Sequence, residues 1–195
     1  NAYITGQATD TFPIFPPATA FKTTITGSHD AFIAKLDSTG ANLLYSTYVG
    51  GSVIDDAFGI ALDGSDPSTL NVYITGYTYS ADFPKIGFAA TGKVVGQTTI
   101  GTAPDAYVFK LNMNGGGGNL DGIYSTYLGG SAPGTGDDRA TAIKVDAAGN
   151  AYVTGRTTSG DFLTVAPVSV QTPLYSTQDG TAKVFVTEIS STGAD

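Results

Sequence analysis

The strongest constraint on the fold of this chain is an internal repeat of about 75 residues. Four short motifs recur in a fixed order, which requires one structural unit used several times. An Asn-x-Tyr-x-Thr-Gly motif occupies residues 1–6, 71–76 and 150–155, and a motif related to Asp-Ala-Phe-x-x-Lys-Leu occupies residues 30–36, 105–111 and 183–189. Tyr-Ser-Thr-Tyr-x-Gly-Gly occupies residues 45–51 and 124–130, and an acidic segment follows it at 55–63 and 137–146.

Each motif predicts a β-strand, because it is short, rich in β-branched and aromatic residues, and bounded by Gly, Asp, Asn or Pro. Apolar residues occupy both alternating faces, with Ala31 and Ile33 on one and Phe32 and Leu36 on the other. A sheet that is apolar on both faces must be covered on both. We therefore predict an all-β fold, a β-propeller-type repeat of four-stranded antiparallel blades, with a β-sandwich as the alternative.

The number of strand motifs predicts an incomplete ring. Ten motifs make about two and a half blades, whereas propellers close with about four to eight. Residues 1–195 are thus expected to form part of one repeat domain, with units at 1–42 (partial), 43–117 and 122–195. Its expected partners are the rest of a longer parent chain or other copies of itself.

The motifs together resemble a known repeat. Tyr-Ser-Thr-Tyr-Leu-Gly-Gly, Asp-Asp-Arg-Ala, Gly-Asn-Ala-Tyr-Val-Thr-Gly and the Asp-Ala-Phe motif are similar to the SBBP ("seven-bladed β-propeller") repeat of bacteria, most clearly over residues 124–162 and 30–63. The resemblance implies a large secreted or surface-attached protein, and it supplies no catalytic residues.

Composition and charge exclude several function classes. The net charge of −8 and the absence of a Lys/Arg cluster argue against nucleic-acid binding and against anionic membrane surfaces. No apolar stretch is long enough to span a bilayer. The chain has no cysteine, and its charged residues are only 13%, while Thr, Ser and Gly are abundant. This composition favours an extracellular or cell-surface location.

Two acidic pairs, Asp55-Asp56 and Asp137-Asp138, are interpreted as occupying the same position of the repeat. Such carboxylates typically accept backbone N–H groups in turns. With backbone carbonyls they could also bind Ca²⁺, which makes all four aspartates candidate calcium ligands. No other cofactor is expected. An acid/base pair is disfavoured, because a repeated motif gives each copy the same environment and catalysis needs unlike ones.

The only histidine lies in Ser28-His29-Asp30, which contains the residue types of a catalytic triad. The other repeats have no histidine there, so we expect no catalytic role and no enzyme activity. A single histidine also excludes a zinc site of two or three histidines.

The most divergent segments are three long connections, residues 7–29, 77–104 and 156–182. Each contains a phenylalanine near its start (Phe12, Phe83 and Phe162), which we expect to pack against the edge of its sheet. The predicted function is a non-catalytic extracellular structural or interaction module, such as a surface scaffold, an adhesin or a filament subunit. The alternative is a propeller that binds a surface glycan or a protein through these connections.

Overall fold

The structure is a computed structural model that describes residues 1–66, 68–86, 100, 103–114, 122–130, 136–162 and 181–193. These residues contain ten strands and no helix, so none of them forms a helix that could cross a membrane. Every motif of the repeat lies on a strand. The strands are β1 (Ala2–Ala8), β2 (Asp30–Leu36), β3 (Leu43–Val49), β4 (Asp55–Leu62), β5 (Asn71–Thr78), β6 (Asp105–Asn112), β7 (Gly122–Leu128), β8 (Arg139–Val145), β9 (Ala151–Thr157) and β10 (Lys183–Ile189).

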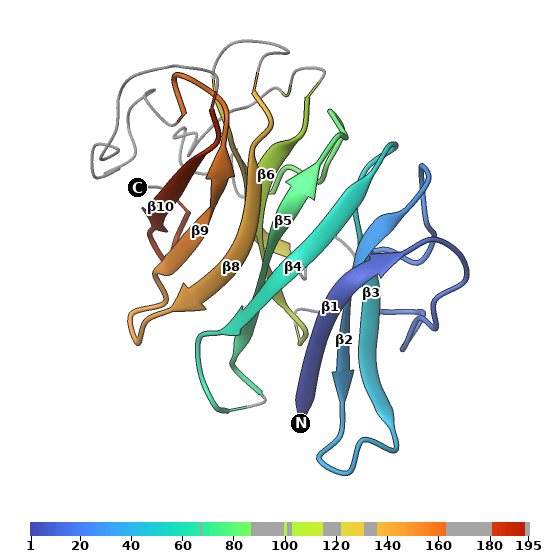
Figure 1. Cartoon of the computed structure of the whole chain (residues 1–195). Coiled ribbons are helices and arrows are strands. Elements are labelled where there is room, and N and C mark those ends of the chain that lie inside the picture. The colour runs from blue at the N-terminus through green and yellow to red at the C-terminus, as the bar shows by residue number, and fades with distance from the viewer. Residues whose placement is uncertain are drawn as a thin grey trace.

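The strands form three antiparallel sheets in chain order: β1-β2-β3, β4-β5-β6-β7 and β8-β9-β10. The sheets lie side by side across the molecule, and β4 contacts both β1 of the first sheet and β8 of the third (Figure 1). This arrangement confirms the prediction of an all-β, propeller-type repeat.

The sheets do not start where the predicted repeat units start. The units at 43–117 and 122–195 begin with β3 and β7, but β3 pairs with β2 and β7 pairs with β6 in the preceding sheet. The reason is the connection on each side of β3. The short turn after Leu36 keeps β2 and β3 in one sheet, whereas the chain after Gly50 and Gly51 passes to β4 in the next sheet.

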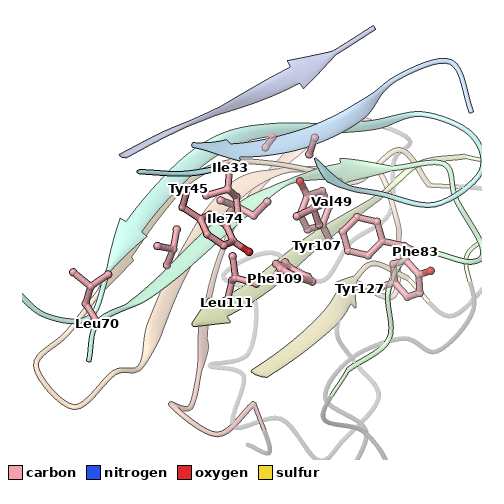
Figure 2. Close-up of a cluster of buried hydrophobic side chains, with 13 residues drawn as sticks. Ile33, Tyr45, Val49, Leu70, Ile74, Phe83, Tyr107, Phe109, Leu111 and Tyr127 are labelled. Carbon is pink, nitrogen blue, oxygen red and sulfur yellow. The ribbon is translucent and has the colours of Figure 1, made fainter. Parts of the chain in front are cut away.

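Two hydrophobic clusters hold the three sheets together. The first lies between the first and second sheets, where Ile33 and Val49 meet Ile74, Tyr107 and Phe109 (Figure 2). The second joins the second and third sheets and is built from Tyr73, Val108, Ile143, Val153 and Phe185, among others. The middle sheet is therefore buried on both faces, as the sequence predicted.

Strand β6 shows this double burial residue by residue. Every residue from Asp105 to Leu111 is buried. Tyr107 and Phe109 pack toward the first sheet, and Ala106 and Val108 pack toward the third. Burial of a large aliphatic or aromatic side chain contributes about 1.5–3 kcal/mol, so β6 makes a large contribution to the stability of both contacts.

The glycine of the Tyr-x-Thr-Gly motif has a specific packing role. A Cβ atom at Gly76 would lie 1.8 Å from the carbonyl oxygen of Asp56, and one at Gly155 would lie 2.0 Å from that of Arg139. Next to each glycine, the register of the neighbouring strand shifts, after Ala57 in β4 and after Ala140 in β8. The glycine lets the irregular first strand of each sheet approach the second closely.

We predict that Gly76→Ala destabilises the fold by about 2 kcal/mol or more, because the new methyl group would overlap backbone rather than a flexible side chain. Gly64→Ala is the matched control, since a Cβ there meets nothing closer than Leu70 Cβ at 3.8 Å. Urea unfolding of both variants measures the difference. Equal midpoints for the two variants would contradict the packing role of Gly76.

Candidate functional site

A buried carboxylate organises the start of the second sheet. Asp55, the first residue of β4, is fully buried. Its Oδ2 accepts the backbone N–H of Gly51 at 2.8 Å and the hydroxyl of Ser80 at 2.9 Å, and its Oδ1 accepts the hydroxyl of Thr78. We call this group the aspartate corner. It joins the Gly-Gly turn, the start of β4 and the end of β5.

The third sheet begins with the same corner. Asp138 Oδ2 accepts the N–H of Gly130 at 3.2 Å and the hydroxyl of Ser159 at 2.5 Å. The backbone contacts match as well: Asp55 N–H donates to the carbonyl of His29, and Asp138 N–H donates to that of Pro104. Asp138 is thus the repeat counterpart of Asp55.

This equivalence corrects the interpretation that the two acidic pairs occupy the same repeat position. Tyr79 N–H donates to the carbonyl of Ile54, and Thr158 N–H donates to that of Asp137, so Asp137 corresponds to Ile54. The second pair is therefore shifted by one residue, and only Asp55 and Asp138 match.

The remaining members of the two pairs have other partners. Asp56 Oδ1 lies 3.1 Å from His29 Nε2. Asp137 accepts Arg139 Nε at 2.6 Å and Arg156 Nη2 at 2.7 Å. In neither pair do the two neighbouring carboxylates share a binding partner. Across the described ranges, no three Asp, Glu, His or Cys side chains gather as metal ligands do.

Each aspartate corner instead faces a buried carboxylate from the preceding sheet. Asp30, the first residue of β2, faces Asp55, since a Cβ at Gly50 would lie 2.7 Å from Asp30 Oδ1 and 2.8 Å from Asp55 Oδ2. Asp105, the first residue of β6, holds the same position beside Asp138. The sequence pattern did not indicate the facing role of Asp30 and Asp105, although both recur at the start of the same motif.

The two carboxylate pairs differ in how their charge is balanced. In the first pair, Lys22 Nζ donates to Asp30 Oδ2 at 2.7 Å, to the carbonyl of Gly50 at 2.7 Å and to Thr26 Oγ1 at 2.6 Å. Lys22 lowers the pKa of Asp30, but burial has the larger effect, so the pKa of Asp30 is raised. Burial also raises the pKa of Asp55.

In the second pair, Asp105 Oδ2 and Asp138 Oδ1 are buried and have no hydrogen-bond partner. Burial, together with the neighbouring charge of Asp138, raises the pKa of Asp105 to about 8. Burial also raises the pKa of Asp138. This pair is therefore the least compensated charged group among the residues that the structure describes.

Ser28, His29 and Asp30 do not form a triad, in line with the expectation that His29 has no catalytic role. Asp30 binds Lys22, while the imidazole of His29 lies between Asp56, at 3.1 Å from Nε2, and Ser28 Oγ, at 3.3 Å from Nδ1. His29 also pairs with Ile54 through the backbone. These contacts connect the first sheet to the second.

The phenylalanines of the long connections pack as the sequence predicted. Phe12, Phe83 and Phe162 each stack on the ring at one repeat position, with centroid distances of 4.3 Å to Phe32, 4.4 Å to Tyr107 and 4.4 Å to Phe185. The greater part of the predicted recognition segments 77–104 and 156–182 lies outside the described residues.

We predict that Asp55→Ala destabilises the chain by about 3 kcal/mol or more, since three buried donors would lose their acceptor. Asp66→Ala is the control, because Asp66 is exposed and its bonds to Ser68 stay within one turn. That variant should lose less than about 1 kcal/mol. Thermal unfolding at pH 7 measures both. A small loss in Asp55→Ala would show that the corner does not hold the sheets together.

Comparison with known proteins agrees with this architecture. A family model described as a beta-propeller repeat, SBBP, matches residues 123–162. The match runs from β7 through β9 to Phe162, so the family repeat, like the predicted units, starts one strand before a sheet does. A search of curated proteins found no match. Residues 123–162 therefore form a beta-propeller repeat of the SBBP family, as the motifs of the sequence predicted.

Proposed function

We propose that this chain is a non-catalytic structural module that works outside the cell or at its surface, as a scaffold, adhesin or filament subunit. The observation that carries the proposal is an apolar face at each end of the row of sheets. Both faces have the character of the contacts between sheets inside the molecule.

The first of these faces lies on β10. Its residues alternate between buried ones, which contact the second sheet, and exposed ones, among them Val184 (81% exposed) and Val186 (65% exposed). Gly155 pairs with Phe185 just as Gly76 pairs with Tyr107, so Val184 and Val186 correspond to Ala106 and Val108. Those two residues are fully buried against the third sheet. The face of β10 is therefore built to meet a further sheet.

The opposite end of the row has a complementary face on β1. Ile4 is 42% exposed, and its repeat counterpart Ile74 is fully buried against the preceding sheet. The N-terminal end thus lacks a preceding sheet among the described residues, and the C-terminal end lacks a following one. We propose that another sheet of the same repeat covers each of these faces. For the isolated chain, that sheet belongs to a second copy of the chain.

A contact between the β10 face of one copy and the β1 face of the next is heterologous, because it joins two different surfaces. Such contacts close into a ring when the rotation per subunit allows it, and otherwise they extend into a filament. Either product fits a scaffold or a filament subunit. The sequence composition, which is low in charge and rich in Thr, Ser and Gly, supports the proposed extracellular location.

We predict that the purified chain self-associates and that the double variant Val184→Asp, Val186→Asp weakens association at least about tenfold, because buried carboxylates would oppose the contact. Val53→Asp is the control: Val53 is also an exposed valine, but it lies in the connection between β3 and β4. Light scattering across concentrations and negative-stain microscopy give the readout. A wild-type chain that stays monomeric at high concentration, or an equal effect of Val53→Asp, would contradict the proposal.

A further inference from the structure

The two junctions between sheets provide an internal comparison. Both place a carboxylate from the preceding sheet, Asp30 or Asp105, beside the aspartate corner of Asp55 or Asp138. In the first junction an ammonium group completes the site. Lys22 Nζ bonds to a carboxylate oxygen, a backbone carbonyl and a hydroxyl, all between 2.6 and 2.7 Å. These are the oxygen donors that also bind hard metal cations.

The second junction has the matching carboxylates and glycine carbonyl, and the described residues place no such cation among them. Asp105 and Asp138 are both more than nine-tenths buried, and each has a carboxylate oxygen with no hydrogen-bond partner. Gly129 corresponds to Gly50, whose carbonyl accepts Lys22. Two buried carboxylates held together without a positive charge are costly, and either a proton or a cation relieves the cost.

We propose that Asp105 and Asp138 bind a calcium ion at the junction between the second and third sheets, in the place that the Lys22 ammonium takes at the first junction. A divalent ion balances both carboxylates, whereas one proton balances only one. With no third carboxylate among the described residues, the affinity falls in the weak range of about 10⁻⁴–10⁻³ M that is typical of extracellular modules. The ion would join two sheets, because β6 and the segment before β8 supply one carboxylate each.

Thermal unfolding of the whole chain at pH 7.5 tests this proposal, first in chelator-treated buffer and then with 10 mM CaCl₂, against NaCl of equal ionic strength. We expect a saturable rise in Tm of about 3–11 °C with calcium only. Titration calorimetry should show one ion per chain. Asp105→Asn should abolish both signals, and it should still fold because the Asp105 side chain holds no hydrogen bond within the described residues.

Asp30→Asn is the matched control, since it changes the equivalent residue at the junction that Lys22 already occupies. It should keep the calcium response. Two results would overturn the proposal. One is a calcium response that survives Asp105→Asn, which would place the ion elsewhere.

The other is a wild-type chain that ignores calcium but loses stability as the pH rises from about 4 towards 8, with no such loss in Asp105→Asn. That result would show that the pair holds a proton. The folded state, with the higher pKa, would then keep a proton that the unfolded chain releases.

Discussion

The fold depends on covering both apolar faces of the middle sheet. The first and third sheets cover this sheet, β4–β7, and β6 is buried along nearly its whole length. A single sheet of this kind could not be stable alone, since both of its apolar faces would stay hydrated. Repetition of the unit is thus the physical solution to two-sided burial.

Apolar contact alone does not fix how one sheet lies on the next, and polar groups supply this alignment. Tyr73 donates its hydroxyl to the carbonyl of Gly149, and Lys110 Nζ donates to that of Ser191, both across the second junction. The aspartate corners act at the other end of the strands. A misplaced sheet would leave these buried groups without partners, so they select one arrangement among many that bury similar area.

Local sequence was enough to predict the strands, their order, the double burial and the stacked phenylalanines, because these follow from side-chain alternation and a repeated pattern. It was not enough to place the sheet boundaries, since which strands pair across a turn depends on contacts distant in sequence. The matching letters of Asp55-Asp56 and Asp137-Asp138 were misleading, because hydrogen bonds of the backbone align Asp137 with Ile54. The facing role of Asp30 and Asp105 emerges only when consecutive sheets are placed together.

Lys22 belongs to the long connection between β1 and β2, and not to any strand of the repeat. The residue that sets the charge of the first junction therefore lies in the segment that differs most between repeats. Strand sequences can stay nearly constant while each connection adjusts the electrostatics of its own junction. In such a chain, divergence of the connections would tune the strength of successive joints one at a time, and a single architecture could contain both permanent joints and joints that respond to the ionic surroundings.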